Sequence, residues 1–116
     1  MIWIDTVPIT PEQRLVVNIL THAYLDLLAD DETEARSSMH FWTSRAGSFA
    51  RWRNHLCSLI DIDGDLAAQI VRSQLDGKRD IPTPGESSKA AARTRHARLV
   101  ERARQRWQHL KNHQPP

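Results

Sequence analysis

Arginine and lysine side chains are concentrated in the last quarter of the sequence. Residues 89–116 hold eight basic side chains against the single acid Glu101, a net charge of +7, whereas residues 1–88 hold eight basic and thirteen acidic ones, a net charge of −5. A helix this rich in arginine binds DNA grooves, RNA stems or acidic protein surfaces. The charge split also allows the chain's own acidic part as the partner. A stripe with spacings of three and four is formed by Arg95, Arg98, Arg102 and Arg106. The predicted nucleic-acid contacts of this segment are Arg93, Arg95, Arg98, Arg102, Arg104, Arg106 and Lys111.

A second group of candidate contacts belongs to a predicted helical hairpin at about residues 48–75, which has the size of a helix-turn-helix. Glutamine and arginine can read base edges, and lysine can hold phosphates. The sequence predicts an outward face with Leu66, Ile70 and Leu75 packed inward. Three acids at the turn oppose this arrangement, because they lie at the end that would meet the phosphates: Asp61, Asp63 and Asp65. The contacts predicted here are Gln69, Arg72 and Ser73, with Lys78 and Arg79 just beyond the helix.

Other chemistries find little support in the sequence. The acids of the hairpin turn resemble the start of a calcium loop, but Leu66 stands where glycine belongs and Arg72 where the bidentate glutamate belongs. Of the six histidines only His109 and His113 have helical i, i+4 spacing, and a lone cysteine offers no zinc pair. No phosphate-binding loop, dinucleotide motif or nucleophile elbow occurs. We therefore expect no metal, no cofactor and no enzymatic activity.

Four helices are predicted in the first 75 residues. Thr10 and Gln13 form a capping box for a helix that should run to about Asp30. This helix is apolar over so much of its surface that it should be the central helix of a bundle or part of a dimer interface. A second helix should start near Asp31 and end before Gly47. A third should be capped by Ser48 and a fourth by Asp63. The buried stripe of the third helix is predicted to be Phe49, Trp52, Leu56 and Ile60.

The predicted fold class is all-α, with a compact four-helix body at residues 1–75 that has its own core. Prolines and glycines predict a linker at residues 76–88. Ser87 or Ser88 should then cap a basic helical arm of roughly 23 residues within residues 89–116. The 116 residues suit one domain, and 40% hydrophobic with 26% charged residues is an ordinary globular composition. The single cysteine and the lack of a membrane span or secretory signal predict a cytoplasmic protein. The basic helix is not expected to bind membranes, because Val100, Trp107 and Leu110 form too narrow an apolar face.

The stretch from about Glu12 to Leu75 resembles a group of small proteins encoded in phages, prophages and gene-transfer-agent loci of alphaproteobacteria. The similarity is carried by QRLVVNILTHAYLDLL, EARSSMHFWTS, SFARWRNHLCSLIDID and DLAAQIVRSQL. Its distinguishing positions are Trp42 to Ser44, Phe49, Cys57, Leu59 to Asp63 and Val71 to Leu75. Some relatives are similar to transcription activators or antiterminators. The resemblance implies a regulatory role in a mobile element, and it does not cover the basic segment.

The leading hypothesis is a phage-type transcription regulator that binds double-stranded DNA through the hairpin and the basic helix. The first alternative is a protein-interaction factor, an antiterminator or an inhibitor, that acts on RNA polymerase or a host defence complex. The second is an arginine-rich RNA binder. A homodimer stays open in each case.

Overall fold

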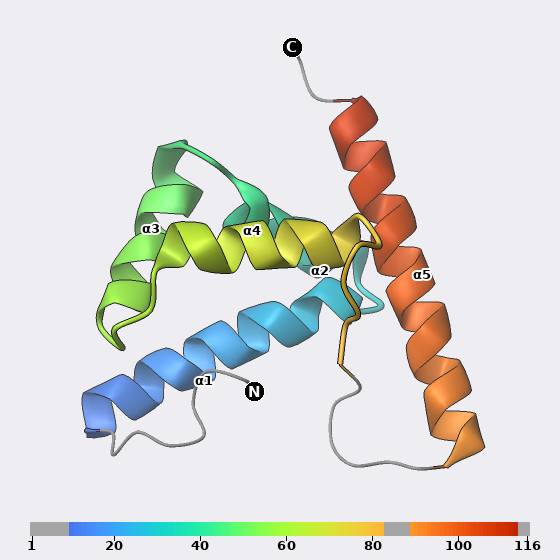
Figure 1. Ribbon diagram of the computed structural model, residues 1–116, viewed down its shortest axis with the longest axis horizontal. Coiled ribbons are helices and arrows are strands. Elements are labelled where there is room, and N and C mark those ends of the chain that lie inside the picture. The colour runs from blue at the N-terminus through green and yellow to red at the C-terminus, as the bar shows by residue number, and fades with distance from the viewer. Residues whose placement is uncertain (1–9, 83–88, 114–116) are drawn as a thin grey trace.

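The chain is all-α in the computed structural model, which describes residues 10–82 and 89–113 (Figure 1). Its elements are α1 (Pro11–Leu25), the 3-10 helix η1 (Asp26–Leu28), α2 (Glu32–Thr43), α3 (Gly47–Ser58), α4 (Gly64–Leu75) and α5 (Ala90–Asn112). No strand occurs in these residues, so the predicted fold class is confirmed, and α5 has the 23 residues expected of it. None of the described helices is both long and apolar enough to cross a membrane.

Side-chain caps begin two of the helices as predicted. Thr10 Oγ1 accepts from the Gln13 backbone N–H at 3.1 Å, while Gln13 Oε1 accepts from the Thr10 N–H at 3.0 Å. Asp63 Oδ1 accepts from the backbone N–H groups of Asp65 and Leu66 at 3.0 and 3.2 Å, which begins α4. These contacts satisfy donors that a helix N-terminus leaves without an intrahelical partner.

Two other predictions, the end of the first helix and the cap of the third, are wrong. The first helix ends at Leu25 rather than near Asp30, because η1 tightens the chain and brings Leu27 into the core at 2% exposure. Ser48 does not cap α3, whose N-cap is Ala46 with no side-chain hydrogen bond. The N-cap of α5 is Lys89, again without a side-chain bond, and the proposed caps Ser87 and Ser88 lie outside the described residues.

The central helix is α2, which contacts every other described helix (Figure 1). Its Trp42 is fully buried. The prediction that the first helix is the central one is wrong, because α1 buries only one face. The alternative, a place in a dimer interface, stays a prediction. Leu15 and Ile19 on α1 are 61% and 38% exposed.

The hydrophobic core extends into α5. Ala103 and Trp107 belong to the same buried cluster as Met39 of α2 and Leu75 of α4. The predicted core of residues 1–75 therefore continues into α5.

The buried face of α3 differs from the predicted one. Leu56 is buried, but Phe49 and Trp52 are 42% and 52% exposed. Arg53 takes the inward place, fully buried, because its guanidinium donates to the carbonyl oxygens of Phe41 and Ser44 at 3.2 and 2.7 Å. These carbonyls lie at the C-terminal end of α2, where the last turn of a helix leaves carbonyl oxygens without an intrahelical N–H partner.

The fourth helix is also rotated from its predicted orientation. Leu66 is 53% exposed and Ile70 is half-buried, while the small residues Ala67 and Ala68 face inward. A close crossing of α3 and α4 explains this choice, since a Cβ placed on Gly64 would lie 2.8 Å from the Asn54 Cα. Small side chains let the two backbones approach, and a leucine on that face would hold them apart.

The first part of the predicted linker is packed on the body. Ile81 is buried at 8% exposure, and His96 Nε2 of α5 lies 2.8 Å from its carbonyl oxygen. Gln74 Nε2 donates to the Asp80 carbonyl oxygen at 3.0 Å. Residues 76–82 therefore form an ordered connection rather than a spacer. The rest of the predicted linker, residues 83–88, lies outside the described residues.

Candidate nucleic-acid interface

Eleven of the twelve predicted contact residues fall into three places in the structure, and Lys78 lies apart from them. One set holds α5 against the body: Arg102, Arg104, Arg106 and Lys111. A second set is exposed on the first part of α5: Arg93, Arg95 and Arg98. A third set lines a groove between α4 and α5, namely Gln69, Arg72, Ser73 and Arg79, and Lys111 reaches it as well.

Two arginines on one side of α5 bind the segment that follows η1. Arg106 Nη1 donates to the Ala29 carbonyl oxygen at 2.7 Å, and its Nη2 donates to the Asp30 carbonyl oxygen at 3.2 Å. Arg102 Nη2 lies 2.6 Å from the Asp30 carboxylate in a solvated ion pair. The Ala29 and Asp30 carbonyls have no helical partner, so the Arg106 guanidinium satisfies them.

On its opposite side, α5 binds the C-terminal end of α4 and the turn that follows. Arg104 donates from Nε to the Gln74 carbonyl oxygen and from Nη2 to the Arg79 carbonyl oxygen, both at 3.1 Å. Asp76 accepts from Lys111 Nζ at 2.7 Å and from Trp107 Nε1 at 2.8 Å. Partial burial raises the pKa of Asp76, but the hydrogen bonds from Lys111 and Trp107 outweigh that effect and hold the pKa below its usual value.

Half of the basic side chains of residues 89–116 are therefore engaged with the chain itself. The stripe predicted from Arg95 to Arg106 is divided, because its C-terminal half contacts Ala29 and Asp30. Sequence spacing correctly placed Arg102 and Arg106 on one helix face, but at this end of α5 that face lies against the body. The acidic part of the chain is a partner of its basic part.

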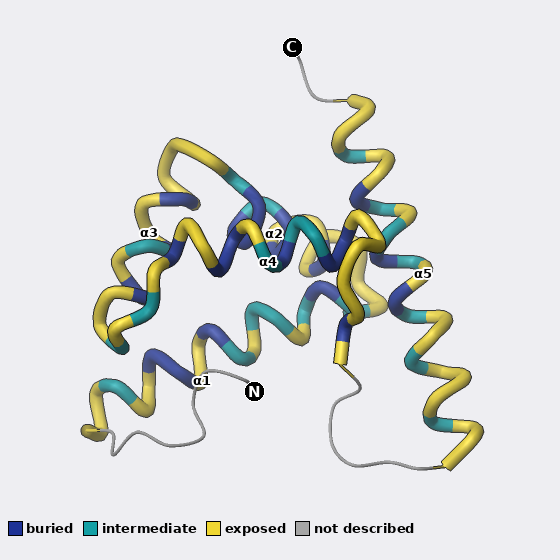
Figure 2. Tube along the Cα trace, in the orientation of Figure 1, coloured by how far each residue is buried: buried dark blue, intermediate teal, exposed yellow. Residues whose placement is uncertain are grey.

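The first part of α5 offers a different environment. Lys89, Arg93, Arg95 and Arg98 are exposed, and none of them forms an ion pair or a side-chain hydrogen bond within residues 10–82 and 89–113. No acid occurs between Lys89 and Glu101. The buried residues of α5 all lie at or beyond Val100, so this end of the helix is mostly exposed in Figure 2. We call residues Lys89–Arg98 the basic end of α5.

The exposed face of α4 is less suited to reading DNA than predicted. Gln69 is exposed as expected, but it lies beside the exposed Leu66. Arg72 is half-buried and donates from Nη1 to the Thr43 carbonyl oxygen at 3.1 Å. Asp63 occupies the helix N-terminus, and Asp65 accepts from Asn54 Nδ2 at 3.0 Å. The end of α4 that would approach a phosphate backbone therefore carries two carboxylates.

The groove between α4 and α5 has a volume of about 400 Å³. Arg45, from the connection between α2 and α3, joins Arg72 and Arg79 there. Burial lowers the pKa of Arg72, and the neighbouring charges of Arg45 and Arg53 lower it further. Lys78 lies apart from this groove, beside Gly77 and Asp80.

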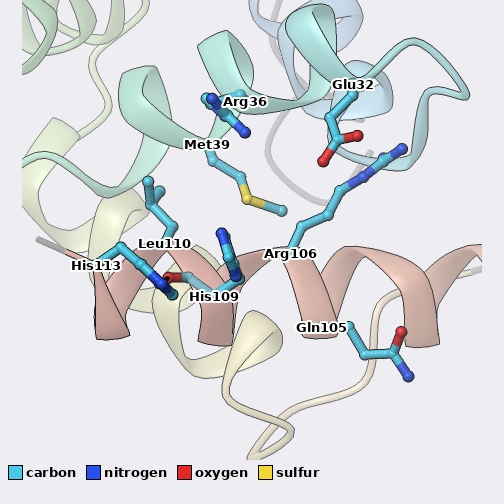
Figure 3. Close-up of a pocket in the computed structure, with 8 residues that line it drawn as sticks. All are labelled: Glu32, Arg36, Met39, Gln105, Arg106, His109, Leu110 and His113. Atoms are coloured by element: carbon cyan, nitrogen blue, oxygen red, sulfur yellow. Dashed lines mark hydrogen bonds between the residues drawn. The ribbon is translucent and has the colours of Figure 1, made fainter.

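A second groove lies between α2 and α5 and has a volume of about 460 Å³ (Figure 3). Met39 points into it from α2, and Arg106 crosses it from α5 on the side of Glu32 (Figure 3). The imidazole rings of His109 and His113 stack with centroids 4.0 Å apart, and His113 Nδ1 lies 2.8 Å from the His109 carbonyl oxygen. This histidine pair, the one with helical spacing, therefore contacts itself and its own helix.

Sequence reasoning missed three basic residues. Lys89 was counted in the charge of the segment but was not placed among the contacts. Arg45 lies in a short connection, where no helical stripe could single it out. Arg53 is not part of the predicted buried stripe of its helix, and only the packing of α2 against α3 shows why it is buried.

No family model, curated protein or solved structure matches the chain. The functional argument therefore depends on the arrangement of the side chains described above.

Proposed function

We propose that the protein is a DNA-binding regulator that holds the phosphate backbone through the basic end of α5. One observation carries the proposal: Lys89, Arg93, Arg95 and Arg98 are exposed within ten residues of helix with no acid among them and no partner in the described part of the chain. Unpaired cations at this density attract a polyanion and release its counterions on binding.

Phosphate contact is better supported than base reading by α4. The carboxylates at the N-terminus of α4 would repel a backbone, and Arg72 already donates to Thr43. In this proposal α4 contributes at most Gln69 and Ser73, while the basic end of α5 supplies the affinity. The regulatory part of the proposal comes from the resemblance to phage and gene-transfer-agent proteins.

The test compares two triple variants with the same loss of charge. Arg93→Gln/Arg95→Gln/Arg98→Gln removes the arginines of the basic end. Arg14→Gln/Arg36→Gln/Arg51→Gln removes three exposed arginines of α1, α2 and α3. Binding of a labelled DNA duplex is followed by fluorescence anisotropy over a range of salt concentrations.

Contact of four cations with phosphates gives a log–log salt slope of about −3.6 for the unmodified protein. The first triple variant should reduce the magnitude of this slope by about 2.7, and the second should leave it nearly unchanged. Equal losses in the two variants, or an unchanged slope in the first, would show that the basic end of α5 is not the contact. Tighter binding of a structured RNA than of the duplex would favour the RNA-binding alternative.

Exposed apolar side chains favour the protein-interaction alternative. Trp52 on α3 and Leu66 on α4 are each more than half exposed, and they are two of seven large apolar residues exposed in the described chain. Aromatic side chains of this kind anchor protein interfaces. If the alternative holds, the chain should bind purified bacterial RNA polymerase in an interferometry assay, and Trp52→Gln/Leu66→Gln should abolish that binding without changing the affinity for DNA.

A further inference from the structure

Four cations from four separate segments meet in the groove between α4 and α5. Arg45 comes from the connection between α2 and α3, Arg72 from α4, Arg79 from the turn after α4 and Lys111 from α5. One carboxylate, that of Asp76, also lines the groove and already accepts from Lys111 and from Trp107 Nε1. The described lining therefore keeps a surplus of positive charge.

The donors of this groove are largely unused. The Arg45 and Arg79 side chains make no hydrogen bond within the described chain, and Arg72 uses only Nη1, toward Thr43. Gln69 and Ser73 add an amide and a hydroxyl whose polar atoms also have no partner among the described residues. Holding four cations near one another with a single carboxylate is unfavourable, since like charges repel. An anion in the groove would remove that repulsion.

We propose that this groove binds the phosphate groups of a small ligand that carries at least two negative charges, such as a diphosphate. A diphosphate presents the oxygens of two tetrahedral phosphoryl groups, which can accept hydrogen bonds from guanidinium groups that converge from different directions. A ligand with a single carboxylate would offset only part of the excess positive charge. The volume of about 400 Å³ exceeds that of a diphosphate and lies in the range of small-molecule sites. Leu66 and Ile70 offer apolar surface for the rest of the ligand.

The groove between α2 and α5 does not offer the same chemistry (Figure 3). Its Arg106 already donates to two backbone carbonyls, and Glu32 lies on the same side of the groove as the end of the Arg106 side chain. The groove between α4 and α5 is also distinct from the proposed DNA contact. Lys111 lies thirteen residues beyond Arg98 on α5, which is about 20 Å along the helix axis.

The experiment titrates the full chain with inorganic pyrophosphate at constant ionic strength and follows binding by calorimetry and by the indole N–H resonance of Trp107. We expect saturable binding and a shift of that resonance. Arg45→Gln/Arg79→Gln should weaken the affinity at least tenfold, because it removes the two arginines with no other partner. The matched control Arg14→Gln/Arg51→Gln removes the same charge elsewhere and should bind as the unmodified protein does.

A second variant guards against damage to the fold. Gln69→Glu changes an exposed side chain and adds a carboxylate to the groove. It should weaken pyrophosphate binding while the circular dichroism spectrum and the melting temperature stay unchanged. Non-saturable binding, or equal affinities in all four proteins, would overturn the proposal.

Competition with a DNA duplex separates the two sources of phosphate. Mutual displacement of pyrophosphate and duplex would mean that the groove holds the DNA backbone, whereas simultaneous binding would mean a free phosphorylated ligand. The triple variant of the basic end of α5 keeps this groove intact. Its pyrophosphate affinity should therefore be unchanged, even if the proposed DNA contact fails its own test.

Discussion

Replacing Trp107 with alanine should destabilise the whole protein, although this residue lies on the last helix. Trp107 is 6% exposed and packs in the same core cluster as Met39 and Leu75. Truncation of a buried tryptophan to alanine costs about 3–5 kcal/mol, from the lost burial and the cavity left behind. The variant also loses the hydrogen bond from Nε1 to Asp76 and the contact of the ring with Lys111 Nζ, which lies 5.2 Å from the ring centroid.

The same substitution at Trp52 is the matched control. Trp52 is 52% exposed, so Trp52→Ala should change the free energy of unfolding by less than about 1 kcal/mol. Trp107→Phe provides an intermediate step. It keeps most of the ring and removes the donor to Asp76, so it should cost about 1.5–3 kcal/mol.

Urea unfolding of the full chain, followed by far-UV circular dichroism, measures these differences. With an m-value of about 2 kcal/mol/M, a loss of about 4 kcal/mol lowers the midpoint by about 2 M. That is a large fraction of the about 5–15 kcal/mol that stabilises a typical domain. If Trp107→Ala and Trp52→Ala lower the midpoint equally, or if Trp107→Ala leaves it unchanged, the packing of α5 in the core is refuted.

Two further predictions concern polar groups. Arg53→Met should destabilise the protein by about 3 kcal/mol in the same urea assay, because the carbonyl oxygens of Phe41 and Ser44 lose their side-chain donor at roughly 1–3 kcal/mol each. Arg51→Met on the exposed side of α3 serves as its control, and equal effects would contradict the role of Arg53 at the end of α2. Asp76 has a lowered pKa in the folded state, so its contribution to stability is complete above its unfolded pKa of about 3.9 and is lost as the pH falls through the folded value. Asp76→Asn should therefore reduce the dependence of the melting temperature on pH between about 4 and 2, and an unchanged slope would show that the bonds from Lys111 and Trp107 do not matter for stability.

Local signals in the sequence were enough to predict the helices and several of their ends. Thr10 and Asp63 are caps because a side-chain oxygen next to a helix start has nearby backbone donors to bind, whatever the rest of the fold does. The length of α5 likewise follows from a run of residues with high helix propensity.

The buried faces of α3 and α4 could not be predicted in the same way. Size and hydrophobicity favoured Trp52 and Leu66 for the interior, but the close crossing at Gly64 admits only small side chains such as Ala67 and Ala68. The carbonyl groups at the end of α2 draw Arg53 inward. Both causes involve a neighbour distant in the sequence, so no pattern within one helix reveals them.

The same limit applies to the candidate site. The spacing of the arginines on α5 predicted a shared face, and the structure agrees that Arg102 and Arg106 lie on one side of the helix. The arginines that contact the body are determined by the path of the chain after η1. The spacing of residues on α5 does not reveal that path. The meeting of Arg45 with Arg72 and Arg79 depends on three separate segments, and nothing in their sequence positions connects them.

The bonds between α5 and the segment that follows η1 also bear on how the chain is synthesised and folded. Arg102 and Arg106 reach partners 72 to 77 positions earlier in the sequence. During synthesis the site around Asp30 emerges long before its partners, so the core next to Met39 and Leu75 stays open until residues up to Trp107 have left the ribosome. Folding of this small domain is therefore expected to finish after translation of α5, with apolar surface exposed until then. A chain interrupted before α5 would present that surface to chaperones and proteases, which gives the cell a way to remove incomplete copies.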